Sequence, residues 1–232
     1  MSFTVVIPYG GDAPGRAQAL AYVQAHLTAH HPDWPVCVSS YDGSFPWSKG
    51  ATVHYGVEAA PRTEGLIIHD ADVLVSPESL RSAALAVVAG APWAMPHDKV
   101  FRLSRRGTMR LFAGQLGPPA VGEVPSIQLE RHPHHAPPGG GCVVLSRAAY
   151  EASGGIDPRF TGWGGEDISW ARALDTLVGP CHRGDAPMWH LWHEPDPTRL
   201  RGGRGSRPNE ILASAYLDAS GDPDLMRTVI AR

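Results

Sequence analysis

The chain has 232 residues, which is enough for one sizeable α/β domain or at most two small ones. Hydrophobic residues make up 43% and charged residues 19% of the chain, a balance that is typical of a globular protein and excludes wholesale disorder. The net charge of −3 provides no overall attraction to nucleic acid or to an anionic membrane.

No apolar run reaches the roughly 18–20 residues that a membrane-spanning helix needs. The first residues, MSFTVVIPYGG, lack the basic region of a signal peptide and lead directly into a strand-like run. We therefore expect a cytoplasmic protein without a transmembrane segment. Cys37, Cys142 and Cys181 are odd in number and widely spaced, which favours reduced thiols over a disulfide framework or a zinc site.

The first part of the chain predicts two strand–helix units followed by a third strand. Aliphatic and β-branched runs predict the strands, and apolar residues at helical spacing predict the helices. The expected strands are 3–7, 35–39 and 65–68, and the expected helices are 14–30 and 49–60. Such a succession forms a parallel, right-handed βαβαβ half that binds nucleotides. The loops after its strands would lie side by side, with Asp42 near the base or ribose.

The third predicted strand ends abruptly in acidic residues, within the stretch Gly65–Val75 (GLIIHDADVLV). Ligands bind at the carboxyl ends of strands in an open α/β sheet, and Asp70 and Asp72 would point the same way on an extended chain. The pair can therefore face one cation or one diphosphate. On this tripeptide alone, solvated acids that cap the next helix are an equally good interpretation. No GxGxxG follows the first strand and the chain has no GxxxxGK[ST], so NAD-type and P-loop chemistry lack their usual motifs.

The middle of the chain predicts one more helix and then a long irregular stretch. Ser76 and Glu78 are a suitable cap and first turn for a helix at 77–89. The regular pattern fades from Pro92 to Pro138, and an insertion of this length is usually functional or mobile. Its run His132–His135 (HPHH) can bind metal, although exposed histidines in a proline-rich loop are the commoner interpretation.

The block from Pro138 to Leu174 contains two features that favour a ligand site. Three glycines precede a strand predicted at 142–145, so the backbone there can approach a ligand closely. Further on, the sequence GWGGED at 162–167 opens a helix predicted at 168–177. A tryptophan face suits a sugar ring, and the two carboxylates can accept hydrogen bonds from hydroxyl groups. The alternative is an acid pair that caps the helix, with the tryptophan in the core.

Together with the Asp-X-Asp strand, this block resembles the glycosyltransferases of GT-A fold. The resemblance is to the galactosyltransferase-like group, with its GGG-strand, GGφDPRF-type turn and W-G-G-E-D, and it runs from the first strand through His193. It implies that Asp167 is the catalytic base and that Glu166 helps to hold the acceptor. It also implies that the Gly/Arg loop 196–208 folds over the donor, although a solvated tail is the simpler interpretation.

The resemblance further implies a histidine late in the chain as the third protein ligand of the metal. His190 and His193 are both candidates, and on an extended segment they would point to different faces. We favour His193 because a loop begins directly after it, and two histidines packed between tryptophans are the alternative. The residues expected at the metal are Asp70, Asp72, His193 and His190. The residues expected at the donor are Pro8, Tyr9, Asp42, Lys49, Asp70, Gly140, Gly141 and Trp163.

We therefore expect an α/β protein with a single GT-A domain over residues 1–232 and a Rossmann-like, mostly parallel central sheet flanked by helices. Residues 1–90 would form the nucleotide-binding half, 91–193 the acceptor and catalytic half, and 194–232 a flexible loop and C-terminal helices.

The predicted function is metal-dependent transfer of a hexose from a UDP-sugar to an acceptor hydroxyl, with inversion. Oxygen ligands plus imidazole fit Mn²⁺ better than Mg²⁺. A glycan, a lipid-linked sugar, a protein or a modified nucleobase can offer that hydroxyl, and the hexose is equally open. The alternatives are a noncatalytic nucleotide-sugar or carbohydrate-binding protein of the same fold and a sugar nucleotidylyltransferase.

Overall fold

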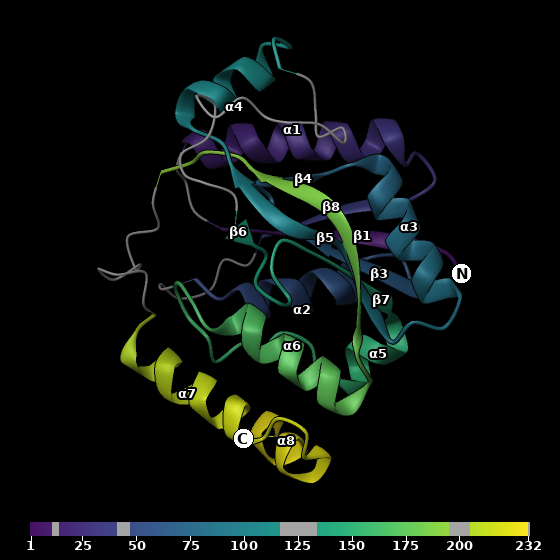
Figure 1. Ribbon diagram of the computed structural model, residues 1–232, viewed down its shortest axis with the longest axis vertical. Coiled ribbons are helices and arrows are strands. Elements are labelled where there is room, and N and C mark those ends of the chain that lie inside the picture. Colours follow the sequence, from purple (N-terminus) through teal and green to yellow (C-terminus); the bar gives the residue numbers. More distant parts are fainter. Residues whose placement is uncertain (11–13, 41–46, 117–133, 195–204, 232) are drawn as a thin grey trace.

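A computed structural model describes residues 1–10, 14–40, 47–116, 134–194 and 205–231. Helices cover both faces of a central sheet (Figure 1). The strands of this sheet are β1 (Phe3–Tyr9), β2 (Val36–Ser40), β3 (Gly65–His69), β4 (Val73–Val75), β5 (Trp93–Arg102), β6 (His134–His135), β7 (Cys142–Ser146) and β8 (Cys181–His190). The helices are α1 (Pro14–His30), α2 (Lys49–Ala59), α3 (Pro77–Val88), α4 (Arg105–Phe112), α5 (Arg147–Ala152), α6 (Glu166–Leu177), α7 (Arg207–Asp218) and α8 (Pro223–Ile230).

The first part of the chain folds as its sequence predicts. β1 pairs in parallel with β2 on one side and with β3 on the other. Val5, Val6 and Ile7 are buried from both faces of the sheet, which explains why the strand is a continuous apolar run rather than an alternating one. Ser76 caps α3 through a hydrogen bond from the backbone N–H of Ser79, as expected.

The sheet is mixed, and the prediction of a mostly parallel sheet is wrong in this respect. Its strand order is β2-β1-β3-β7-β5-β8-β4, with β6 paired to β5 outside this path. β7 runs antiparallel to β3 because it begins at the edge where β3 ends, with Cys142 opposite His69. β5 is likewise antiparallel to β7, and β4 is antiparallel to β8. By contrast, β5 and β8 run parallel to each other.

The expectation of an irregular stretch from Pro92 to Pro138 is also wrong for a large part of it. This stretch contains β5, one of the two longest strands among the described residues, as well as α4 and β6. The sequence pattern conceals β5 because its pairing with β8 shifts register at His97, and polar residues follow the apolar start of the strand. Residues 117–133 of the stretch lie outside the described residues.

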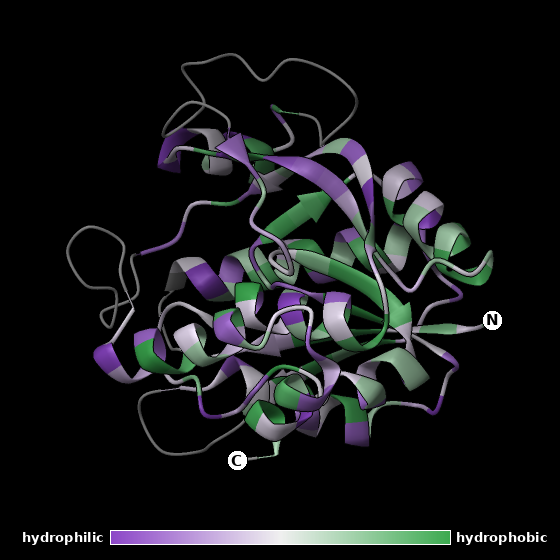
Figure 2. Ribbon diagram, turned by 60° about the horizontal axis from the view of Figure 1, so that its bottom comes forward, coloured by the Kyte–Doolittle hydropathy of each residue, from purple (hydrophilic) through white to green (hydrophobic). Residues whose placement is uncertain are grey.

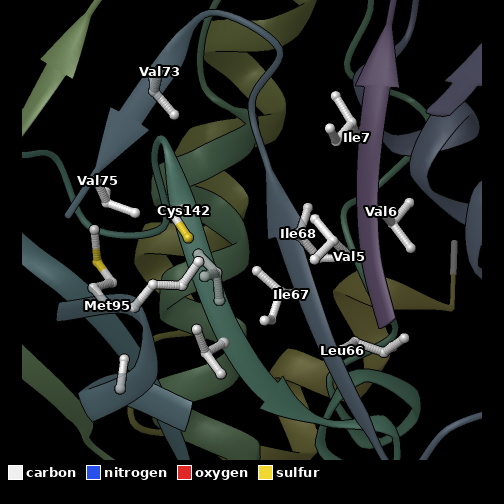
Figure 3. Close-up of a cluster of buried hydrophobic side chains, with 14 of the residues drawn as sticks. Val5, Val6, Ile7, Leu66, Ile67, Ile68, Val73, Val75, Met95 and Cys142 are labelled. Atoms are coloured by element: carbon white, nitrogen blue, oxygen red, sulfur yellow. The ribbon is translucent and has the colours of Figure 1, made fainter. Parts of the chain in front are cut away.

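The hydrophobic core lies on both faces of the sheet. Side chains of β1, β3 and β7 interdigitate there, with Ile67 and Ile68 beside Val5 and Cys142 (Figure 3). Helices α1 and α3 lie on one side of the sheet, and α2, α5 and α6 lie on the other (Figure 1). The strands at the centre of the sheet are mostly green, whereas the helices around them carry both green and purple residues (Figure 2). Among the described residues, no helix combines the length and the apolar character of a membrane span.

The helices α7 and α8 pack on the outer side of α6 (Figure 1). They enclose a second apolar cluster formed by Phe160, Ala173, Tyr216, Ala219, Met226 and Val229. The buried carboxylate of Asp157 anchors this layer, because it accepts hydrogen bonds from the Arg159 guanidinium and from the Tyr216 hydroxyl, the latter at 2.9 Å. The turn that precedes the GWGGED sequence is therefore tied to the C-terminal helices.

We expect Gly141→Ala to destabilise the protein more than Gly114→Ala does. Both glycines have left-handed φ angles, +82° and +69°, so alanine at either position costs about 1–2 kcal/mol. A Cβ at Gly141 would also overlap the sulfur of Met188, which is 3% exposed and therefore cannot swing into solvent, whereas a Cβ at Gly114 meets no described atom within 4 Å. Overpacking of this kind adds about 1–3 kcal/mol. Urea denaturation measures both costs, and equal losses of unfolding free energy would contradict the close packing described for Gly141.

Candidate functional site

A cavity of about 530 Å³ opens at the edge of the sheet where β1 and β3 end. Its walls come from the carboxyl ends of these strands, the start of α2, the glycine-rich segment before β7, the start of α6 and the end of β8. Almost all residues expected at the site line it, namely Pro8, Tyr9, Lys49, Asp70, Asp72, Gly140, Gly141, Trp163, Glu166, Asp167, His190 and His193. Asp42 and most of the loop 196–208 lie outside the described residues.

Asp72, His190 and His193 form a cluster that can hold a metal ion. One ligand atom from each lies within 4.8 Å of the others. β4 and β8 bring them together, because Val73 pairs with His190 and the backbone N–H of Leu191 donates to the Asp72 carbonyl at 2.7 Å. β8 ends at His190, so the chain is no longer an extended strand at His193 and both rings reach Asp72. Two histidines thus join the cluster, where the extended-chain argument favoured only one.

Hydrogen bonds orient both imidazole rings of the cluster. The Nδ1 atom of His190 lies 2.8 Å from the Leu191 carbonyl oxygen, and that of His193 lies 2.7 Å from the Glu194 carbonyl oxygen. An Nδ1–H that donates to a carbonyl leaves Nε2 for a metal, which is the usual arrangement in metal sites. The Nε2 atom of His193 lies 3.0 Å from the Asp72 carboxylate.

The charges of the cluster favour a cation. Burial by itself raises the pKa of Asp72, but the neighbouring His190 and His193 outweigh burial and hold this pKa well below its ordinary value. Burial lowers the pKa of His190 to about 4, so its ring is neutral near pH 7. Burial also opposes protonation of His193, but the hydrogen bond and the charge of Asp72 raise its pKa. A proton on His193 thus offsets the carboxylate charge that a metal ion would offset.

Asp70 contacts Lys49 and is not part of this three-residue cluster. The Lys49 ammonium lies 2.6 Å from Asp70 Oδ1 and 2.8 Å from Asp167 Oδ1, and the lysine is 8% exposed. Burial disfavours its charge, but Asp167, Asp70 and Glu166 together raise its pKa well above the ordinary value. Lys49, which was expected at the donor, therefore links the Asp-X-Asp motif to the acid pair of α6.

Glu166 and Asp167 form the first turn of α6 and differ in their surroundings. Burial, with a smaller contribution from the Asp167 charge, raises the pKa of Glu166 to about 7, and its buried Oε2 has no hydrogen-bond partner among the described residues. Burial also raises the pKa of Asp167, although the Lys49 ammonium opposes this shift. Both carboxylates are thus stronger bases than exposed acids, and Glu166 has unused capacity for a hydrogen bond.

Several residues that line the cavity were not singled out by sequence reasoning. They are Arg16, Trp47, Arg102, Met188 and Trp192. Arg16 lies in the first turn of α1, and no sequence motif marks an arginine at that position as a site residue. Arg102 lies at the end of the missed strand β5, opposite His190. Trp192 is covered by the Arg105 guanidinium at 5.1 Å from its ring centroid.

The histidine-rich run also contributes to the cavity wall. His134 and His135 form β6, which pairs with Val100 and Lys99 of β5. The side chain of His135 is exposed, as the simpler interpretation had it, but both histidines line the cavity. Neither belongs to the cluster of Asp72, His190 and His193.

No protein-family model matches the sequence, and no curated protein matches it. Solved structures share its fold. The catalytic domain of Drosophila β1,4-galactosyltransferase 7, in complex with xylobiose, has a TM-score of 0.55 and 12% identity, covering 92% of this chain and 79% of that chain. GalNAc-T7 with UDP, GalNAc and Mn²⁺ has a TM-score of 0.54 and 15% identity, covering 94% of this chain and 49% of that chain.

This chain spans about half of the GalNAc-T7 chain that it matches. The bifunctional IspDF from Campylobacter jejuni has a TM-score of 0.47 and 11% identity, covering 80% of this chain and 50% of that chain. Identities this low concern the fold alone. The expected α/β architecture is confirmed as a GT-A-like fold with a mixed central sheet, similar in structure to GT-A glycosyltransferases.

We expect the affinity for Mn²⁺ to fall as the pH decreases through the raised pKa of His193. Metal binding must displace the proton on Nε2, so the affinity should drop about tenfold per pH unit below that pKa. His190, with a pKa of about 4, adds no proton cost near neutrality. Titration with Mn²⁺ between pH 6 and 8, followed by electron paramagnetic resonance, measures this dependence. The variant His182→Ala should show the same pH dependence as the wild-type protein, because His182 is an exposed histidine of β8 outside the cluster. An affinity that is constant over this range would contradict the assignment of His193.

Proposed function

We propose that this protein is a metal-dependent glycosyltransferase that moves a hexose from a UDP-sugar to an acceptor hydroxyl with inversion. The observation that carries this proposal is that a single cavity holds both a carboxylate–imidazole cluster and a separate pair of basic carboxylates. The first can hold a cation against a diphosphate, and the second can accept a proton. The GT-A-like fold supports the same conclusion, as analogy.

Asp72, His190 and His193 would hold the metal ion. One carboxylate and two imidazoles fit Mn²⁺ better than Mg²⁺, which prefers oxygen ligands alone. When bound, Mn²⁺ would neutralise the negative charge that develops on the departing UDP. Arg16 and Arg102 line the same end of the cavity, and their guanidinium groups suit the remaining diphosphate oxygens. The GalNAc-T7 structure contains UDP and Mn²⁺, which is consistent with this assignment.

Asp167 would act as the general base. Lys49 holds its Oδ1, which leaves Oδ2, beside Gly140, to take the proton of the acceptor hydroxyl. The acceptor oxygen then bonds to the anomeric carbon from the side opposite UDP, and the electron pair of the broken bond leaves with UDP. Glu166, whose Oε2 has no partner in the part of the chain that the structure describes, would accept a hydrogen bond from another hydroxyl and so orient the acceptor. Trp163 offers a flat face for a sugar ring in the same cavity.

The rival functions differ from this proposal in one measurable property. A noncatalytic sugar-binding protein would bind UDP-sugar and Mn²⁺ without releasing UDP. A sugar nucleotidylyltransferase would release pyrophosphate from UTP and a sugar phosphate, again without UDP. Mn²⁺-dependent release of UDP from a panel of UDP-hexoses therefore separates the three functions. Mass spectrometry of candidate acceptors then identifies the product.

We expect Asp167→Asn to lower the rate of UDP release at least ~100-fold, because loss of a general base typically costs 10²- to 10⁴-fold. Binding of UDP with Mn²⁺ should stay at the wild-type level, since the metal cluster does not include Asp167. Glu166→Gln is the matched control at the neighbouring position, and it should mainly weaken acceptor binding. Initial rates and calorimetry of UDP·Mn²⁺ binding test both variants. Near-normal turnover of Asp167→Asn beside an inactive Glu166→Gln would reverse the two roles.

A further inference from the structure

The loop that carries Trp163 into α6 is held by residues outside itself. α6 begins after Gly165, which has a φ of +100° and no side chain to cap the helix. By contrast, α2, α3, α4, α5, α7 and α8 each begin at a serine or aspartate that accepts a backbone hydrogen bond. A helix start without its own cap takes its direction from surrounding contacts. The start of α6 bears Glu166 and Asp167, so these contacts matter for the site.

The side chain of Asn209, in the first turn of α7, supplies most of these contacts. Asn209 is 2% exposed, and its amide is directed at the backbone of the loop. Its Nδ2 donates to the carbonyl oxygens of Thr161 and Gly164, both at 3.0 Å, and approaches that of Trp163 at 3.5 Å. Its Oδ1 accepts from the backbone N–H of Thr161 at 3.4 Å. One buried amide thus binds both sides of Trp163.

The loop also lies close to Gly205, just before the Ser206 cap of α7. A Cβ added at Gly205 would lie 3.0 Å from the Trp163 carbonyl oxygen, and one added at Gly164 would lie 3.3 Å from the Gly205 Cα. On its other side the N–H of Gly162 in the loop donates to the Trp47 carbonyl oxygen at 2.7 Å. Asn209 and Trp47 therefore hold the loop from two sides.

Docking of α7 itself does not need Asn209. Tyr216 of the same helix is buried, and its hydroxyl donates to Asp157 at 2.9 Å. The apolar cluster around Phe160, Met226 and Val229 adds to that attachment. The helix therefore has an independent anchor, and all four described contacts of the Asn209 amide go to the loop.

We infer that Asn209 is a positioning residue that sets the direction of Trp163 and of the acid pair at the start of α6. The inference rests on the proposed function, because it assigns Asn209 a role in that reaction. Asn209 does not line the cavity and acts through the loop backbone. Asn209 thus connects the C-terminal helices α7 and α8 to the loop that positions Glu166 and Asp167 in the cavity.

The sharpest test is Asn209→Asp, which keeps the shape of the side chain and replaces its donor by a second acceptor. The new carboxylate oxygen would face the carbonyl oxygens of Thr161 and Gly164, so the loop loses the bonds that Nδ2 donates and is repelled. Tyr216→Phe is the matched control, because it removes a buried hydrogen bond from the same helix and leaves the loop contacts in place. Both variants are first compared by thermal denaturation.

Two readouts then separate positioning from general stability. Hydrogen exchange, followed by mass spectrometry of peptides covering 159–165, should be at least tenfold faster in Asn209→Asp than in wild type and unchanged in Tyr216→Phe. UDP release from UDP-galactose or UDP-glucose with Mn²⁺ should show a kcat at least tenfold lower in Asn209→Asp. The KM for the UDP-sugar should stay within twofold of the wild-type value, because the metal cluster is untouched.

Two results would overturn the inference. One is unchanged exchange of 159–165 in Asn209→Asp. The other is an equal loss of kcat in Tyr216→Phe at a matched loss of thermal stability, which would make Asn209 a purely structural residue. If the wild-type protein releases no UDP from any UDP-hexose, the proposed function fails, and the exchange comparison alone decides whether Asn209 holds the loop.

Discussion

The site depends on one buried ammonium group, that of Lys49. Four carboxylates line the cavity, those of Asp70, Asp72, Glu166 and Asp167, and like charges this close repel strongly when they are partly buried. Lys49 lies between Asp70 and Asp167, which come from distant parts of the chain, and compensates both. Removing one partner from a buried ion pair typically costs about 3–5 kcal/mol, and partial exposure of these aspartates lowers that figure.

The backbone around Lys49 is also held in place by contacts with a distant part of the chain. Ser48 caps α2 and also donates to the Pro158 carbonyl oxygen at 2.9 Å. A Cβ at Gly50 would lie 2.5 Å from the Ile156 carbonyl oxygen, so the start of α2 packs directly on the turn that leads towards α6. Lys49 therefore cannot shift without moving that turn. The cavity is consequently divided into an end with Asp72, His190 and His193, which can hold a cation, and an end with Glu166 and Asp167, which can accept a proton.

Sequence patterns predict those parts of this structure that depend on local or strictly periodic features. The apolar run of β1, the Ser76 cap and the acids after β3 fall where they were expected, because propensity and burial act within a few residues there. The bulged strand β5 and the antiparallel entry of β7 depend on partners distant in sequence, so they were missed. The same holds for the Lys49 bridge, for Arg102 and for the convergence of His190 and His193. The contacts of Asn209 span 45–48 residues, and no local pattern indicates them.

The central claim is that Asp72, His190 and His193 hold the cation that binds the donor. Electron spin-echo envelope modulation of the Mn²⁺·UDP complex tests it directly, because ¹⁴N nuclei bonded to Mn²⁺ modulate the echo. We expect coupling to two imidazole nitrogens, reduced to one in either His190→Ala or His193→Ala. We also expect phosphorus coupling from the UDP diphosphate in the same complex. A spectrum without any directly bonded nitrogen, while UDP still binds, would contradict the account.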